Sequence, residues 1–340
     1  MKVTISDVAK KAGVSKSTVS RIINGNHEQN TEETIQRVLK VIEELDYKPN
    51  ALARSLKSTK TNVIGIILSN LQNQFWSNAL EGVEDTCRSL GYNLMICNSN
   101  DEGQLEEDHI RSFQMRQLDG LIINPTLKNK HLYQKLMEDG FPFVSINRKI
   151  YNLDVHVVTV NNINGANVAI QHLIDIGKKK IAIFLYPPAE ISPRLERLEG
   201  YKRTLLNNGI EINQSLIQIV GEEKGEVEEA VKQVIHSKHI PDAIFSTNNM
   251  MTLEILEGIK NQGLKVPDDI ALVGYDETIW AKHLYPPLTT VKQPAYEMGS
   301  FAAKKVIQLI EGSKDEVQLP KVVSLEPSLI IRESCGGKRS

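Results

Sequence analysis

A short basic and polar segment near the start of the chain has the residue types that read a DNA duplex. In "VSKSTVSRII", residues 14–23, Val19, Ile22 and Ile23 recur at helical spacing and define an inner face. The outward face carries Lys16, Ser17, Ser20 and Arg21. Arginine can bond bidentately to guanine in a major groove, and serine or lysine can reach base edges or phosphates. We expect this helix to enter a major groove; a solvated face that docks on a protein is the alternative.

Two further helices are predicted to position this segment. Ile5, Val8, Ala9 and Ala12 recur at helical spacing, and Gly13 ends that helix. Ser15 can cap the second helix and Thr31 a third, which has Glu32 and Glu33 at its positive end. The inward residues of the third helix are expected to be Ile35, Val38, Leu39, Ile42 and Leu45. Side chains that could hold phosphates are Thr4, Ser6, Thr18 and Asn24. The pattern predicts a helix-turn-helix unit.

Polar residues follow several apolar segments of the remaining chain. These residues are Ser69, Asn70, Asn147, Arg148, Asn161, Asn248, Asn249, Asp276 and Gln293. If the segments are parallel strands, such residues meet at the carboxyl edge of a sheet, where ligands bind. Amides and carboxylates suit a polyhydroxylated ligand, and Phe75 or Trp76 could cover the apolar face of a sugar. Considered one at a time, each asparagine is more simply explained as a turn or capping residue than as a ligand-binding one.

The sequence offers little support for catalysis. Motifs for phosphate loops, dinucleotide binding, serine hydrolases and zinc proteases are absent, and the eight histidines are scattered. We predict no catalytic residues, no metal and no cofactor. An enzyme that uses the expected ligand site for catalysis remains an alternative to a binding protein. The acidic run of Asp101, Glu102, Glu106, Glu107 and Asp108 is expected to be solvated surface.

The charge distribution separates a basic head from an acidic remainder. The formal net charge is −2, yet residues 1–60 hold 11 Lys and Arg against 7 Asp and Glu, and the rest holds 29 against 35. A basic head indicates a polyanionic partner. Three cysteines without a C-x-x-C pair favour a reducing compartment, and no apolar run is long enough for a membrane span. We expect a cytoplasmic protein associated with the nucleoid.

The region after residue 61 alternates apolar strands with amphipathic helices. The expected strands are 63–68, 93–98, 120–124, 143–147, 157–161, 180–185, 216–220, 243–247, 270–276 and 289–293, and "SLIIR" at 328–332 is a last one. Strands that alternate with helices indicate parallel sheets covered on both faces. The number of strand–helix repeats exceeds the number of strands in a sheet of usual size. We therefore predict two similar α/β lobes that enclose a cleft.

The opening residues resemble the DNA-binding head of the LacI/GalR family of bacterial transcription regulators. The resemblance is carried by "TISDVAKKAGVSKSTVSRIINGN" and "TIQRVLKVIEELDYKPNALARSLKS", and it continues through the body. It implies that Lys16, Ser17 and Arg21 read bases. It also implies a hinge that folds into a short helix on the operator and inserts Leu56 into the minor groove. Other implied DNA contacts of the hinge are Asn50, Ala53 and Arg54. A flexible linker with incidental leucines is the alternative.

The resemblance also implies a body with the two-lobed periplasmic-binding-protein fold. Motifs of the family place effector-binding residues at Arg197 in "RLERLEGY", Asn248 in "FSTNNMM", Asp276 in "LVGYDE" and Gln293 in "YPPLTTVKQP". The implied domains are a helix-turn-helix domain 1–48, a hinge 49–60, and an effector-binding and dimerisation domain 61–335. The N-lobe of this body is expected at 61–161 and 292–324, and the C-lobe at 162–291 and 325–335.

Two departures from the family pattern concern charge. Asn147 stands where the family usually has an acidic residue, and Asn248-Asn249 replaces the common Asn-Asp pair. Arg148, Arg194 and Arg197 remain near the expected cleft. We therefore hypothesise an anionic effector, such as the sugar acids 2-keto-3-deoxygluconate or gluconate, or a sugar phosphate. Neutral drift at Asn147 and a solvated Arg194 are the alternative explanation.

The sequence therefore predicts a regulator of carbohydrate or sugar-acid genes. We expect a repressor that binds a pseudo-palindromic operator in double-stranded DNA as a homodimer and responds to a sugar-like effector. Release by an inducer and tightening by a corepressor both remain open. The alternative function is a cytosolic sugar-binding protein whose head docks on another protein.

Overall fold

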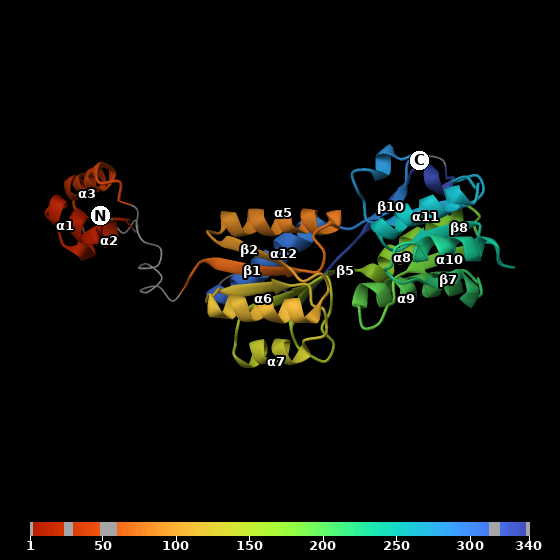
Figure 1. Cartoon of the computed structure of the whole chain (residues 1–340), viewed down its shortest axis with the longest axis horizontal. Helices are drawn as coiled ribbons and strands as arrows, with labels where there is room; N and C mark the ends of the chain where they lie inside the picture. The colour runs from red at the N-terminus through yellow and green to blue at the C-terminus, as the bar shows by residue number, and fades with distance from the viewer. Residues whose placement is uncertain (1–2, 24–29, 48–59, 313–319, 338–340) are drawn as a thin grey trace. The chain divides into compact units, whose positions relative to one another are not determined.

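The chain folds into two units in the computed structural model, which describes residues 3–23, 30–47, 60–312 and 320–337. Its contacts divide into one unit spanning Met1–Thr61 and another spanning Asn62–Ser340. We call these units the head and the body (Figure 1).

The described part of the head consists of three helices whose ends follow the predicted signals. Gly13 ends the first helix in a left-handed conformation with φ of 66°. The Ser15 hydroxyl accepts the Thr18 backbone N–H at 3.1 Å, and the Thr31 side chain caps the third helix. The helices are α1 (Ile5–Ala12), α2 (Lys16–Ile23) and α3 (Glu32–Glu44).

The apolar core of the head corrects one sequence expectation. Val8, Val19 and Val38 are fully buried at the centre of the unit. Leu39, which was expected to point inward, is 42% exposed, and Val41 is buried instead. A helix turns about 100° per residue, so Leu39 lies about 100° from Val38 while Val41 lies only about 60° from it. The heptad-like spacing of Leu39 was misleading because the buried stripe is centred on Val38.

The first lobe of the body, the N-lobe, is built on a six-stranded sheet with the order β11-β5-β4-β3-β1-β2. All of its strand pairs are parallel. Near-continuous apolar strands fit such a sheet, because helices cover both of its faces. The elements are β1 (Val63–Leu68), α5 (Gln74–Ser89), β2 (Asn93–Asn98), α6 (Gly103–Met115), β3 (Gly120–Ile123), α7 (Lys130–Glu138), β4 (Phe143–Ile146), β5 (His156–Val160), α12 (Ala295–Glu311) and β11 (Val322–Leu325).

The second lobe, the C-lobe, repeats this architecture with the strand order β12-β10-β9-β8-β6-β7. Its pairs are parallel except for β10 with β12. Its elements are α8 (Asn162–Asp175), β6 (Ile181–Leu185), α9 (Ser192–Asn207), η1 (Gln214–Leu216), β7 (Ile217–Ile219), α10 (Glu226–Ile235), β8 (Ala243–Ser246), α11 (Asn249–Asn261), β9 (Ala271–Tyr275), η2 (Ala281–His283), β10 (Thr289–Lys292), β12 (Ser328–Ile330) and η3 (Glu333–Cys335).

The chain passes between the lobes three times, after β5, after β10 and after β11. Each lobe has two apolar cores, one on each face of its sheet. In the N-lobe, α5 and α12 cover one face and α6 and α7 the other, as Figure 1 shows. The three crossings leave the lobes joined by strands and short loops, the arrangement that permits hinge motion.

Helices α5 and α12 pack unusually closely because glycines meet backbone at their contact. A Cβ added at Gly82 would lie 2.0 Å from the Tyr296 carbonyl oxygen, and one at Gly299 would lie 1.9 Å from that of Ala79. Real Cβ atoms do not approach oxygen so closely. The two glycines therefore fix the separation of these helices on the N-lobe sheet.

The described strands agree with the ten expected segments and with the last one to within one or two residues, and sequence analysis missed only β11. No helix in the described ranges is both long and apolar enough to cross a membrane.

Candidate functional site

The first candidate site is the outward face of α2 in the head. Lys16 and Ser17 are exposed in the first turn of the helix, and Ser20 and Arg21 are half-buried one turn later. The Arg21 Nε lies 3.4 Å from the Ser17 carbonyl oxygen. These side chains lie on one face because they are spaced at one helical turn. The face can present a guanidinium, an ammonium and hydroxyls to the edges of bases.

Four hydroxyl groups at the starts of α1 and α2, those of Thr4, Ser15, Ser17 and Thr18, are already engaged within the head. Thr4 donates both its backbone N–H and its hydroxyl to Asp7 Oδ2, at 2.9 and 2.7 Å. The hydroxyl and backbone bonds from Thr4 lower the pKa of Asp7. Ser15 contacts the hydroxyls of Ser17 and Thr18 at 2.7 and 2.9 Å. A phosphate contact from Thr4 would therefore compete with its own helix cap, whereas the exposed Ser6 has no such requirement.

Five residues expected to bind DNA lie outside the described residues: Asn24, Asn50, Ala53, Arg54 and Leu56.

The second candidate site is a cleft between the two lobes of the body. It has a volume of about 360 Å³, in the range of small-molecule sites. All ten residues expected to bind an effector line it: Ser69, Phe75, Trp76, Asn147, Arg148, Arg194, Arg197, Asn248, Asp276 and Gln293. Sequence reasoning therefore identified the walls of the cleft, because parallel strands of both sheets end there.

An aromatic pair forms one wall of the cleft. Phe75 and Trp76 lie in the first turn of α5, their ring centroids are 4.9 Å apart, and the planes meet at 71°. Both residues are buried, so packing fixes their orientation. Asn73 caps this helix by accepting the Phe75 backbone N–H at 2.9 Å. The wall offers an apolar surface to the face of a sugar ring.

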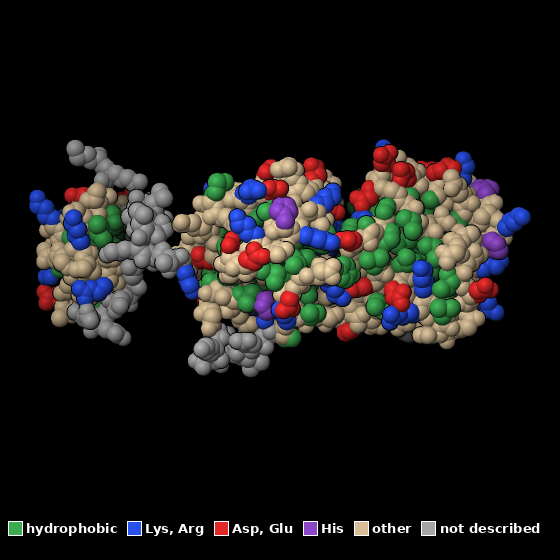
Figure 2. All heavy atoms as spheres, turned by 90° about the horizontal axis from the view of Figure 1, so that it is seen from below, with side chains coloured by type: hydrophobic (Ala, Val, Ile, Leu, Met, Phe, Trp, Pro, Cys, Tyr) green, Lys and Arg blue, Asp and Glu red, His purple; other side chains and the backbone are tan. Residues whose placement is uncertain are grey.

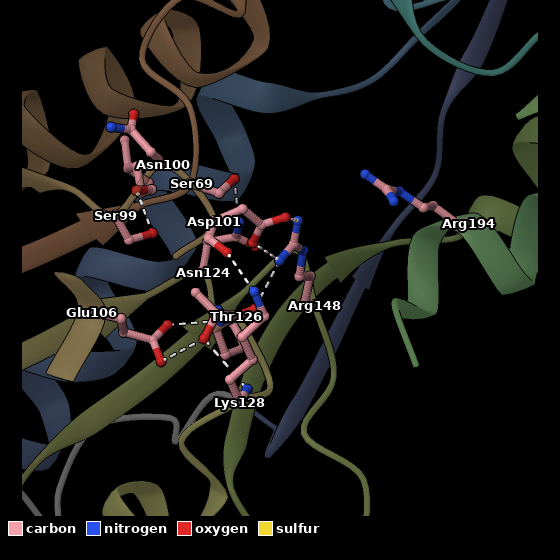
Figure 3. A network of polar contacts seen from close by, with 12 residues as sticks. Ser69, Ser99, Asn100, Asp101, Glu106, Asn124, Thr126, Lys128, Arg148 and Arg194 are labelled. Atoms are coloured by element: carbon pink, nitrogen blue, oxygen red, sulfur yellow. Dashed lines mark hydrogen bonds and ion pairs between the residues drawn. The ribbon is translucent and has the colours of Figure 1, made fainter. Parts of the chain in front are cut away.

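The arginine of the N-lobe is held by a carboxylate that sequence analysis had assigned to solvated surface. Arg148 Nη1 and Nη2 donate to the two oxygens of Asp101 at 2.5 and 2.9 Å, and Nη1 also donates to the Pro125 carbonyl at 3.0 Å (Figure 3). Asp101 lines the cleft. The expectation was wrong because Asp101 follows the end of β2, so it lies at the same sheet edge as the predicted residues. That position in the sequence was a usable signal.

Glu106 also departs from the expected acidic surface, because it is fully buried. Its carboxylate accepts the Thr126 backbone N–H at 2.7 Å, the Thr126 hydroxyl at 2.9 Å and Asn129 Nδ2 at 2.9 Å. The Tyr133 hydroxyl also donates to it. Four donors replace the lost hydration of a buried carboxylate. Glu106 thereby holds the loop after β3 beside Arg148 (Figure 3).

In the C-lobe, Arg197 lies at the base of the cleft with only 8% of its surface exposed. Its Nε donates to Asn162 Oδ1 at 3.0 Å, and its Nη1 donates to the Thr247 carbonyl at 2.7 Å. The guanidinium carbon lies 3.7 Å from the centroid of the Tyr275 ring. These contacts fix the plane of the guanidinium.

Asp276 faces the same region and accepts a hydrogen bond from Gln293 Nε2. Burial raises the pKa of Asp276, whereas the charge of Arg197 and the bond from Gln293 act in the opposite direction. Gln293 Oε1 is buried and has no hydrogen-bond partner among the described residues, and the same holds for Asn147 Oδ1. Two residues that line the cleft therefore each keep a buried acceptor that is unpaired within the described ranges in this arrangement of the lobes.

The other predicted residues already form hydrogen bonds within the protein. Arg194 donates to Glu222 at 2.6 Å and to the Pro187 carbonyl at 2.9 Å. Asn248 Oδ1 caps α11 by accepting the Met250 backbone N–H at 2.9 Å. Ser69 accepts from Asn124 Nδ2 at 2.7 Å. Arg148 and Arg194 are thus both paired, which removes part of the reasoning for an anionic effector.

Four residues that line the cleft have a backbone in the left-handed region. The φ angles are 49° at Asn100, 60° at Asp101, 67° at Asn147 and 75° at Asp276. Asparagine and aspartate tolerate this region better than other residues with a Cβ. Their concentration at one site indicates backbone strain at a functional position.

Several bonds join the lobes across the cleft. Asn249 Nδ2 donates to Asn73 Oδ1 at 3.0 Å, and the Lys149 backbone N–H donates to the Ser192 hydroxyl at 2.9 Å. Lys149 Nζ also donates to Glu196 at 2.5 Å. Asn249, noted above as a departure from the family pattern, thus supplies a donor that an aspartate would lack. These bonds hold the observed angle between the lobes.

The described residues contain no group of three or more His, Cys, Asp or Glu side chains positioned to hold a metal ion.

These features define a class of protein: a regulator with a helix-turn-helix head and a two-lobed, ligand-binding body. A model described as "Bacterial regulatory proteins, lacI family" matches residues 4–50, and one described as "Periplasmic binding proteins and sugar binding domain of LacI family" matches residues 61–327. The chain belongs to the LacI family of bacterial transcription regulators. The predicted family, fold class and regulatory function are confirmed.

Individual relatives align along nearly the whole chain. The probable HTH-type transcriptional regulator EndR of Paenibacillus polymyxa is 36% identical over 337 residues, which is 98% of each chain. The HTH-type transcriptional regulator KdgR of Bacillus subtilis (strain 168) is 33% identical over 335 residues, 97% of each.

Solved structures give the same result. The lac repressor dimer bound to operator and the anti-inducer ONPF superimposes with a TM-score of 0.85 at 25% identity, covering 98% of this chain and 99% of that one. The complex of the transcriptional regulator CelR with cellobiose gives 0.73 at 29% identity, with the same coverage.

Proposed function

We propose that this regulator is a repressor of carbohydrate genes whose operator affinity is set by a small polyhydroxylated effector in the cleft. The observation that carries the proposal is the convergence of all ten expected residues on one cleft, with buried polar groups from both lobes. Such a site is built to recognise a ligand rich in hydroxyl groups. We also propose that the cleft binds this ligand without turnover and that the protein acts in the cytoplasm, on the nucleoid.

In the head, we propose that Lys16, Ser17 and Arg21 read base edges in a major groove. Their support is their shared face on α2 and the excess of positive charge in residues 1–60. Ser6, Thr18 and Ser20 would add phosphate contacts. The hinge at 49–60, with Asn50, Ala53, Arg54 and Leu56, would order on the operator, insert Leu56 into the minor groove and kink the duplex.

We propose that a second copy of the chain completes the operator-binding form. Strand β2 is at the edge of its sheet, and Ile96 on it is 44% exposed. In the C-lobe, Ile279 is 68% exposed and Tyr285 is fully exposed. Figure 2 shows hydrophobic side chains gathered on the body, most densely on the C-lobe near its junction with the N-lobe. Exposed apolar side chains on both lobes favour a homodimer with two-fold symmetry, which suits a pseudo-palindromic operator.

The effector would act by changing the equilibrium between two arrangements of the lobes. A ligand shifts this equilibrium only through a difference in affinity for the two arrangements. Asn73, Lys149, Ser192 and Asn249 make bonds between the lobes, so a ligand that changes the angle between the lobes also changes the free energy of these bonds. Either an inducer or a corepressor fits this scheme.

A gel-shift experiment tests the proposal. Duplexes selected from a random pool by the purified protein should be bound more tightly than unselected duplexes, and binding should weaken steeply as salt rises. Addition of sugars should change the affinity for the selected duplex alone. Binding that shows no sequence preference at any salt concentration would reject operator recognition.

A further inference from the structure

The charges that line the cleft balance one another. Three arginines line it, Arg148, Arg194 and Arg197, and so do three carboxylates, Asp101, Glu222 and Asp276. Two of the arginines donate directly to carboxylates, Arg148 to Asp101 and Arg194 to Glu222. Arg197 and Asp276 lie close enough for the charge of one to affect the titration of the other. The cleft therefore has no formal excess of positive charge to offer an anion.

The Arg148–Asp101 pair is the most firmly built of these contacts. Arg148 is only 6% exposed, and both of its terminal nitrogens are used by the two oxygens of one carboxylate. This parallel arrangement is the strongest geometry for an arginine and a carboxylate. The Lys128 ammonium donates to the Asp101 carbonyl oxygen at 3.3 Å and further fixes this residue. Figure 3 shows the pair at the edge of the cleft, with Arg194 pointing toward it from the other lobe.

Two residues that line the cleft also keep hydrogen-bond acceptors that are unpaired within the described part of the chain. Gln293 Oε1 and Asn147 Oδ1 are buried acceptors without a partner among the described residues. The orientation of the Gln293 amide is fixed because its nitrogen donates to Asp276. A ligand group that reaches these acceptors must donate, as a hydroxyl does and an ionised carboxylate oxygen does not, so they add no site for the charged group of an acid.

We infer that the effector is an uncharged sugar or short oligosaccharide, and that Asp101 is the specificity residue that excludes sugar acids and sugar phosphates. The inference rests on the proposed function of the cleft and narrows its ligand class. An anion would have to displace Asp101 from Arg148 or lie beside its carboxylate, and either event costs free energy that a hydroxyl group does not lose. A diol can instead accept from the arginine and donate to the carboxylate of the intact pair.

The test uses the full-length protein and titration calorimetry with matched pairs of probes. The pairs are glucose with glucuronate or glucose 6-phosphate, and cellobiose with cellobiouronate, in which both members keep their pyranose rings; a panel of other aldoses and their uronic acids extends the series. The wild type should bind the neutral member of a pair more tightly than the charged member. In Asp101→Asn, Arg148 loses its counter-charge, so the preference should move toward the acid by about tenfold or more. The left-handed backbone at position 101 suits asparagine as well as aspartate.

The control is Asp108→Asn, which makes the same chemical change on the exposed surface of α6. It should leave the preference as in the wild type. A wild type that binds the acid more tightly, or an Asp101→Asn protein with the preference of the control, overturns the inference while leaving the cleft as the effector site. The comparison in the wild type stands even if Asp101→Asn fails to fold. If no probe binds either protein, the sugar effector of the proposed function fails, and the inference fails with it. The gel-shift experiment then still decides on operator recognition.

Discussion

Replacement of Arg197 by alanine tests the link between the cleft and the operator. The substitution removes the bonds to Asn162 and the Thr247 carbonyl, the contact with the Tyr275 ring, and the charge beside Asp276. A hydrogen bond to a charged group is worth about 1.5–3 kcal/mol, and a desolvated contact between a cation and an aromatic ring is worth about 2 kcal/mol. These contributions overlap, so we expect the body to lose about 3–5 kcal/mol of unfolding free energy, out of the roughly 5–15 kcal/mol typical of proteins.

The effect should depend on pH in a defined direction. Burial raises the pKa of Asp276, and Arg197 opposes that rise. Without Arg197 the pKa of Asp276 rises further in the folded protein. A carboxyl group with a raised folded-state pKa stabilises the fold when protonated and loses this contribution as the pH rises through that pKa. The stability difference between wild type and Arg197→Ala should therefore be smaller near pH 5 than at about pH 8.

The assays are urea unfolding at the two pH values and a gel shift with and without effector. Arg197→Ala should still bind the selected operator, because the head forms a separate unit, but operator binding should no longer respond to the effector. Arg203→Ala is the matched control, since Arg203 lies on the same helix and forms an exposed pair with Glu199. It should cost about 0–1 kcal/mol. Equal losses at both pH values would refute the electrostatic effect of Arg197 on Asp276, and a retained effector response would refute its place in the effector site.

Three further substitutions test the other sites. Arg21→Ala should weaken binding to the selected operator by about 1–3 kcal/mol in a gel shift and leave binding to random duplexes nearly unchanged. Gly299→Ala should lower the unfolding free energy of the body by several kcal/mol, because its new methyl group would collide with the Ala79 carbonyl, although alanine normally stabilises a helix by about 1 kcal/mol relative to glycine. Glu106→Gln should cost about 1–3 kcal/mol in urea unfolding, since the amide keeps one acceptor oxygen but turns an NH2 group toward a donor that the second carboxylate oxygen now satisfies.

Each of these outcomes has a clear opposite. Equal weakening of specific and random binding by Arg21→Ala would show that Arg21 contacts phosphates only. A more stable Gly299→Ala protein would mean that α5 and α12 can separate without loss. An unchanged unfolding midpoint for Glu106→Gln would mean that the buried carboxylate contributes nothing to the loop after β3.

The fold was largely predictable because its signals are local and repeated. The caps at Gly13, Ser15 and Thr31, and the apolar strands of both lobes, depend on residues adjacent in sequence. The edge strand β11 was missed, because "VVSL" is only four residues long and alternates in burial. Leu39 was misplaced because helical spacing alone does not fix the centre of the buried stripe.

The walls of the cleft were also predictable, but the pairing of the charges within it was not. The end of a strand places a polar residue at the right edge of a sheet, which was enough for Asp276 and Gln293. The partner of Arg148 is Asp101, 47 residues away in the sequence. The two residues follow β4 and β2, which are separated in the sheet by β3 and β1, so only the assembled sheet and its loops bring them together. Burial of Glu106 depends likewise on a loop 20 residues further along the chain. Long-range pairs of this kind have no local signature.

The left-handed backbone at Asn100, Asp101, Asn147 and Asp276 limits how the cleft can evolve. Only glycine, asparagine and aspartate occupy such positions readily, and the last two have nearly the same shape. An exchange between them alters the electrical character of the pocket by one unit and leaves the scaffold in place. Single substitutions can therefore change the specificity of descendants of this protein toward differently charged metabolites without a change of fold.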